Sequence, residues 1–186
     1  MKKLLLLAAV MLGIAAMMAG SASGASDPRQ AALADLSNQA DLGTTTTVAT
    51  ADGTATTTAY LDTVATTAIL GADGYLCGTV QYRAIEKAYD FWGFVVWTYR
   101  ETFGVHVCHN HVGYKTALYD EPMDSNFGWT WCGNVAKQFT NQTSSAIGYT
   151  KGCFTVAYKI VQTKYPWASM TIGGNGHLWA RKTGGA

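Results

Sequence analysis

The sequence predicts a mainly β protein: an antiparallel β-sandwich or partly closed barrel, with a short N-terminal helix and a Thr/Ala-rich segment. Residues 75–186 hold 21 of the 22 aromatic residues of this 186-residue chain, so the bulky side chains of a core lie there. Several short segments of that region alternate between apolar and polar residues, which is the period of a half-buried strand. Short turns separate these segments, as is typical of antiparallel sheets.

The alternation and the apolar runs predict eight strands in this region. They span residues 75–83, 91–99, 103–109, 112–119, 127–132, 153–161, 167–172 and 177–182. Gly173-Gly174-Asn175-Gly176 predicts a hairpin turn between the last two strands. Residues 84–90 fit a loop or one helical turn, and residues 120–126, which include Pro122, predict a loop.

The N-terminus has the pattern of a secretory signal peptide over residues 1–25. Lys2 and Lys3 precede an apolar run at residues 4–18, and small residues follow at 19–25. The alternative is a buried apolar helix. The run is shorter than the roughly 20 residues that cross a bilayer, and no later stretch is as apolar. We therefore expect a secreted, extracellular protein whose mature chain has no membrane span.

Residues 26–74 form a separate, Ala/Thr-rich segment in the predicted domain division, before a β domain at residues 75–186. Asp27 is suited to cap a helix, Pro28 to its first position, and Gly43 to follow its end. The Thr-rich remainder buries little and predicts a weakly ordered spacer. Two alternatives remain open: an edge hairpin that turns at Asp52-Gly53, and a pro-segment that is removed after export.

All four cysteines lie in the predicted β domain. In an exported chain they are expected to form disulfides, and four cysteines allow three pairings. Locality and their places in or at the ends of strands favour Cys77–Cys108 and Cys132–Cys153. Each bridge would contribute about 3 kcal/mol in the chain-entropy description.

The charge of the chain argues against nucleic acid as a partner. Loss of Lys2 and Lys3 with the leader would lower the formal net charge from +1 to −1. A near-neutral chain has no overall electrostatic attraction to nucleic acid or to an anionic membrane. The lysines and arginines of the second half are scattered and form no run.

No set of residues in the sequence has the pattern of a catalytic or metal site. Glu86, Glu101 and Glu121 are the candidates for a glycosidase carboxylate pair, but their spacing does not place two of them across a cleft. His109 and His111 could contribute to a metal site but are expected in a turn, without a third ligand nearby. We expect no catalytic residues, no metal and no cofactor.

The tryptophans are the best candidates for binding. All six lie on predicted strands, where sheet-face aromatics either fill a core or contact sugars and partner proteins. The four binding candidates among them are Trp97, Trp129, Trp131 and Trp179. Trp129 and Trp131 share one face of their strand, and the core interpretation is favoured for this pair.

Several motifs between residues 74 and 180 resemble an uncharacterised group of small secreted β-sandwich proteins of actinobacterial type. The matching pieces are Cys77, Gly93-Phe94-Val95, Val107-Cys108 with Asn110, Asp124-Ser125-Asn126-Phe127-Gly128-Trp129, and Tyr165-Pro166-Trp167. The chain departs from the pattern at His111, where a turn glycine is expected. The resemblance implies an extracellular β-sandwich-like domain, and it carries over no catalytic residue.

Together these observations predict a secreted, non-enzymatic β-sandwich that binds a glycan or a protein partner, or serves in the cell envelope. One alternative is a small secreted polysaccharide hydrolase that uses the glutamates above. Another is a bacteriocin-like secreted toxin.

Overall fold

The structure is a computed structural model that describes residues 27–158 and 160–186. The predicted signal peptide at residues 1–25 lies outside the described residues. Within them, no helix is both long enough and apolar enough to cross a membrane.

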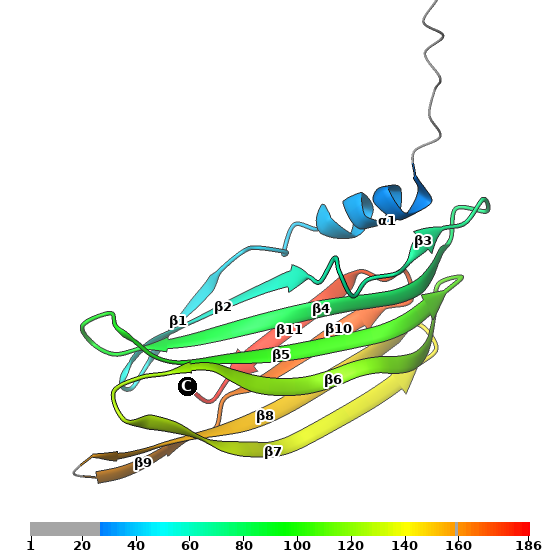
Figure 1. The fold of residues 1–186 in the computed structure, drawn as a ribbon. Helices are drawn as coiled ribbons and strands as arrows, with labels where there is room; N and C mark the ends of the chain where they lie inside the picture. The colour runs from blue at the N-terminus through cyan, green and yellow to red at the C-terminus, as the bar shows by residue number, and fades with distance from the viewer. Residues whose placement is uncertain (1–26, 159) are drawn as a thin grey trace, which may run out of the picture.

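The chain folds into two antiparallel sheets that face each other, so the predicted mainly β, sandwich-like fold is confirmed (Figure 1). The first sheet has the order β1-β2-β4-β5-β6, with β3 paired to β4, and the second has the order β11-β10-β8-β7, with β9 paired to β8. The first contains β1 (Thr46–Thr50), β2 (Gly53–Leu61), β3 (Ile69–Leu70), β4 (Leu76–Tyr89), β5 (Val95–Cys108) and β6 (His111–Ser125). The second contains β7 (Trp129–Gln142), β8 (Ser145–Tyr158), β9 (Ile160–Lys164), β10 (Trp167–Gly173) and β11 (Leu178–Gly184).

The one helix of the described part of the chain, α1 (Pro28–Ser37), covers one end of the sandwich beside β3 (Figure 1). Asp27 caps it, since its carboxylate accepts a hydrogen bond from the backbone N–H of Arg29 at 3.0 Å. Leu36 is fully buried and belongs to the same core cluster as Leu76 and Val80. We call this end of the molecule the helix end, and the opposite end, where the β4–β5 turn lies, the tip end.

Residues 27–74 are part of the sandwich, which differs from the expectation of a weakly ordered spacer. β1 and β2 form the edge hairpin that was the alternative, with Thr50 paired to Gly53 across the turn. β2 then pairs with β4 from Thr54 to Leu61. The alternating Ala and Thr side chains of β2 are small, but their inward half is buried against the other strands, so they need little bulk of their own.

The strands of the β domain are longer than the sequence predicts. β4 continues through residues 84–89, where we expected a loop or a helical turn, and β6 continues through most of residues 120–126. The two strands expected at 91–99 and 103–109 are one strand, β5, while Phe91 to Phe94 form a turn. Polar residues at the middle of these strands, such as Glu86 and Glu101, interrupt the apolar pattern although they are buried.

The core has two apolar clusters with a polar layer between them. The cluster at the helix end contains Tyr82 and Phe103, and the cluster at the tip end contains Trp97 and Phe154. Glu86, Glu101, Asp120 and Thr150 are buried at the level between these clusters. The Tyr99 hydroxyl lies 2.6 Å from the Thr150 hydroxyl and donates to the Asp120 carboxylate at 3.2 Å.

Both disulfides join neighbouring strands. Cys77 and Cys108, which pair across β4 and β5, form one bridge at the helix end. Cys132 on β7 and Cys153 on β8 form the other. These are the two pairs that locality favoured among the three pairings.

Candidate functional site

Two of the four tryptophans singled out from the sequence belong to the core. Trp97 is only 1% exposed and stacks on Phe154 with 5.0 Å between ring centroids. Trp131 is half-buried, and its ring meets Phe154 edge-on, also at 5.0 Å. Trp97 therefore has no ring face open to a ligand, and Trp131 packs against the same core cluster, as Trp129 does.

Trp129 lines a cavity of about 230 Å³ at the tip end. Its apolar wall includes Ala88, Phe91 and Trp97. Polar side chains also line it, and the ammonium of Lys164 is bound to the Asp52 carboxylate at 2.5 Å. The cavity is therefore mainly apolar, and at least two of its polar groups already satisfy each other.

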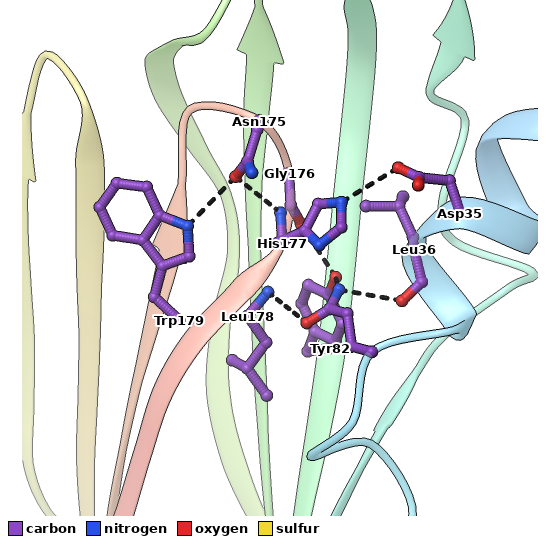
Figure 2. Close-up of polar contacts among 9 residues, drawn as sticks. Asp35, Leu36, Tyr82, Asn175, Gly176, His177, Leu178 and Trp179 are labelled. Atoms are coloured by element: carbon purple, nitrogen blue, oxygen red, sulfur yellow. Dashed lines mark hydrogen bonds and ion pairs between the residues drawn. The ribbon is translucent and has the colours of Figure 1, made fainter.

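Trp179 is the one candidate with an open ring, since 52% of the residue is exposed. It lies on β11, and Leu178 before it points into the core, so the alternation of the strand turns Trp179 outward. The predicted turn between β10 and β11 brings Asn175 next to it. The indole N–H donates to the Asn175 side-chain oxygen at 3.2 Å, as Figure 2 shows.

Gly173 gives the Trp179 indole a flat support. A Cβ atom on this glycine would overlap the indole ring, so no other residue leaves room for the observed ring position. One part of the ring thus packs on the β10 backbone, and the N–H edge is held by Asn175. The remaining surface faces solvent as a fixed aromatic platform.

The platform borders a shallow, mostly polar depression of about 520 Å³ at the helix end. Its walls come from the end of α1, the residues that follow it, and the β10–β11 hairpin. The lining residues are Asp35, Asn38, Gln39, Ala40, Asp41, Asn175, His177, Leu178 and Trp179. We call this depression the Trp179 site.

Gln39 holds the two walls of the Trp179 site together. Its side-chain oxygen accepts the backbone N–H of Leu178 at 2.9 Å, and its NH₂ group lies 2.7 Å from the Tyr82 hydroxyl. The Tyr82 hydroxyl in turn donates to the Gly176 carbonyl at 2.9 Å (Figure 2). Burial raises the pKa of Tyr82 well above its usual value, so this hydroxyl remains a donor at any physiological pH.

A second chain of contacts crosses the site near its surface. The Asn175 oxygen that holds Trp179 also accepts the backbone N–H of His177 at 3.2 Å. The His177 ring nitrogen Nε2 lies 3.0 Å from the Asp35 carboxylate on α1 (Figure 2). These contacts fix the positions of the wall residues relative to the indole.

Several polar groups of the site remain available to a ligand. Asn38 and Asp41 are exposed, and within the described residues their side chains make no hydrogen bond. The NH₂ group of Asn175 is also free of partners there, since only its oxygen is used. A carboxylate and two amides beside an aromatic ring can bind several hydroxyl groups at once.

The three glutamates considered for hydrolysis are not arranged as an accessible pair. Glu101 is fully buried, so a substrate has no path to its carboxyl group. Burial raises its pKa well above the usual value, and the nearby Asp120 charge adds to the shift. Burial also raises the pKa of Glu86 to about 8. Glu121 is bound instead to Arg100, 2.5 Å away.

The two histidine candidates, His109 and His111, lie at the β5–β6 turn at the helix end. His109 lies 3.0 Å from the Asp73 carboxylate, and His111 starts β6 at the edge of its sheet. The only described group with metal-ligand proximity joins His109 to Cys77 and Cys108. Because those two sulfurs form a disulfide, they are not thiolate ligands.

Sequence reasoning missed one prominent surface feature, a group of exposed aromatics at the tip end. Phe91, Trp92 and Phe94 lie in the β4–β5 turn, and Phe127 lies in the β6–β7 turn. We had assigned residues 91–94 to a strand because they are almost all apolar. Asp90 and Gly93 are turn-forming residues and were the available signal for the turn.

Comparison with known proteins found no match to this chain among family models, curated proteins or solved structures.

Proposed function

We propose that this protein is a secreted, non-enzymatic β-sandwich that binds a glycan at the Trp179 site. The observation that carries the proposal is the fixed, half-exposed indole beside a polar depression. The C–H face of a sugar ring is apolar and stacks on an aromatic ring, while its hydroxyl groups need hydrogen-bond partners at the edge. Trp179 supplies the aromatic ring for stacking, and Asn38, Asp41 and Asn175 supply the hydrogen-bond partners.

The preformed geometry of the site supports this proposal. Gly173 and Asn175 hold the indole in place, so a ligand would not have to order it on binding. Preorganised groups lose less conformational entropy when they bind, which raises affinity. The openness of the depression suits one or two sugar residues of a longer chain that continues into solvent.

The predicted signal peptide and the two disulfides support an extracellular place of action. Disulfides persist in oxidising compartments and are rare in the cytosol. Polysaccharides of the cell envelope or of the surroundings are the glycans that an exported protein would meet. The resemblance to small secreted actinobacterial-type proteins agrees with this setting.

Binding to insoluble polysaccharides tests the proposal. The oxidised protein is incubated with cellulose, chitin and purified peptidoglycan, and the bound fraction is measured after sedimentation. We expect at least one polysaccharide to retain the protein, and Trp179→Ala to weaken that binding at least tenfold because the stacking surface is lost. Gly173→Ala should weaken it too, since the added methyl group displaces the indole.

Trp92→Ala is the matched control, because Trp92 is another exposed tryptophan and lies at the opposite end of the molecule. It should bind as the wild type does. The proposal fails if none of the three polysaccharides retains the protein, or if Trp179→Ala binds as tightly as Trp92→Ala.

A further inference from the structure

The tip end carries four exposed aromatic side chains that the proposed function does not use. Phe91 is 77% exposed, Trp92 82%, Phe94 59% and Phe127 64%. They lie in two neighbouring turns, and the rings of Phe94 and Phe127 are 5.9 Å apart. We call these four residues the aromatic tip. Burying such residues is the usual outcome of folding, so their joint exposure indicates contact with something outside the chain.

The β4–β5 turn displays its aromatics rigidly. The Asp90 carboxylate accepts hydrogen bonds from the backbone N–H groups of Trp92 at 3.0 Å and of Phe94 at 2.9 Å. Gly93 adopts a φ of 84°, which an L-residue rarely adopts, and closes the turn. The aspartate charge is thus directed at the backbone, while Phe91 and Trp92 project into solvent.

The β6–β7 turn is attached to the start of β5 and brings Phe127 beside the β4–β5 turn. The backbone N–H of Asn126 donates to the Val96 carbonyl at 2.8 Å, and its side chain donates to the Val95 carbonyl at 3.1 Å. Phe127 itself has a φ of 54°, which is a strained conformation for a bulky residue. Strain of this kind persists where the surroundings enforce it, often at functional positions.

The size and shape of the aromatic tip favour a lipid surface over a protein partner. An aromatic side chain offers 150–250 Å², so the four offer roughly 500 Å² at their exposed fractions. Stable protein interfaces need about 800 Å² on each partner, together with a complementary shape. The tip is instead formed by two protruding turns, which can enter a lipid interface without any complementary surface.

The charges near the tip indicate which lipids it suits. Residues 90–95 and 123–128 contain two aspartates, Asp90 and Asp124, and no lysine or arginine. Lys164, on the neighbouring strand β9, is bound to Asp52. Within residues 90–95 and 123–128 an anionic headgroup would therefore find no cation, whereas tryptophan and phenylalanine suit the interface of an uncharged bilayer.

We propose that the aromatic tip inserts into the headgroup region of a zwitterionic lipid bilayer. The 14-residue strand β4 connects this end to the helix end, a span of roughly 45 Å. The bound protein would therefore hold the Trp179 site away from the membrane (Figure 1). This inference is independent of the glycan proposal, because the two sites share no residue.

Sedimentation with phosphatidylcholine vesicles tests this inference. The oxidised wild-type protein should sediment with these vesicles and remain bound in 0.5 M NaCl, since the attraction is apolar. A Phe91→Ser/Trp92→Ser double variant should lose at least tenfold in vesicle affinity. Trp179→Ala, a matched exposed tryptophan at the other end, should bind vesicles as the wild type does.

Phe127→Asn separates insertion from folding. Asparagine accepts a positive φ more readily than phenylalanine, so the variant should unfold at the same or a higher urea concentration. It should nevertheless lose several-fold in vesicle affinity. The inference is overturned if the wild type does not sediment with phosphatidylcholine, if it binds only vesicles that contain phosphatidylglycerol, or if the tip variants bind like the wild type.

Discussion

Glycines inside strands make room for aromatic rings in this protein. Added Cβ atoms at Gly148 and Gly152 would overlap Phe103 and Trp131, respectively, as one at Gly173 would overlap Trp179. A glycine in a strand usually weakens it, but here each lets a large ring pack flat on the backbone.

Glu86 makes the stability of the protein depend on pH. Its pKa is raised by burial to about 8 in the folded state, against 4.5 in its unperturbed state. The folded protein therefore binds more protons than the unfolded chain between these values, and the free energy of unfolding falls as pH rises from 5 to 8. We expect Glu86→Gln to reduce that fall by about 1–3 kcal/mol, as measured by urea unfolding at the two pH values.

Glu121→Gln provides the control for this prediction, since it makes the same chemical change at a partly exposed residue paired with Arg100. Glu101 is buried as well, so some pH dependence should remain in Glu86→Gln. An equal loss of stability between pH 5 and 8 in wild type and Glu86→Gln would contradict the conclusion that Glu86 contributes to the pH dependence of stability.

One polar side chain beyond the end of α1 adds to the apolar contacts that hold the helix to the sandwich. Gln39 bonds to the Leu36 carbonyl, to Tyr82 and to the backbone N–H of Leu178. Gln39→Ala leaves that backbone N–H without its partner and should lower the free energy of unfolding by about 2 kcal/mol. Gln138→Ala, at an exposed position of β7, should change it by less than about 0.5 kcal/mol in the same urea titration.

Loss of the Gln39 contacts should also weaken the proposed glycan binding, because this residue joins the two walls of the Trp179 site. A Gln39→Ala variant as stable as Gln138→Ala would show that the Gln39 contacts add little to the attachment of the helix.

Strand existence was easier to predict than strand length. Residues 167–172 and 177–182 closely match β10 and β11, because a clear turn separates two alternating segments. β4 and β5 were cut short because Glu86 and Glu101 look like surface residues. Period-2 patterns identify a strand only where its inward residues are apolar.

Residues 27–74 complete the first sheet and supply part of the core. β2 pairs with β4 over eight residues, and Leu36 and Ala59 are fully buried in the helix-end cluster. We expect a protein that consists of residues 75–186 alone to show no cooperative thermal transition by circular dichroism, because one side of its core is uncovered. Residues 27–186 with both disulfides serve as the control.

A cooperative transition of the shorter chain within a few degrees of the control would contradict this prediction and would favour the pro-segment alternative. A broad transition without near-ultraviolet signal would support it, since such a state has lost its fixed packing.

The candidate site illustrates how far sequence reasoning reaches. The turn at Asn175 was predicted, because glycine-rich turns have a local signature. Trp179 was one of four candidates, and no local pattern distinguished it from Trp97, which is buried. The contribution of α1 to the site was not predicted, because Asp35 and His177, which meet there, are 142 residues apart in the sequence. The aromatic tip was missed because an apolar turn and an apolar strand look alike in composition.

The sequence by itself determined the β class of this protein, the positions of its cysteines and the capped start of its helix. Those features follow from local rules: side-chain periodicity, capping chemistry and turn residues. Only the tertiary structure decided which tryptophans are buried, that residues 27–74 complete the first sheet, and that Glu86 and Glu101 lie inside. Burial depends on which distant strands pack over a residue, and the residues next to it in the sequence do not determine that packing.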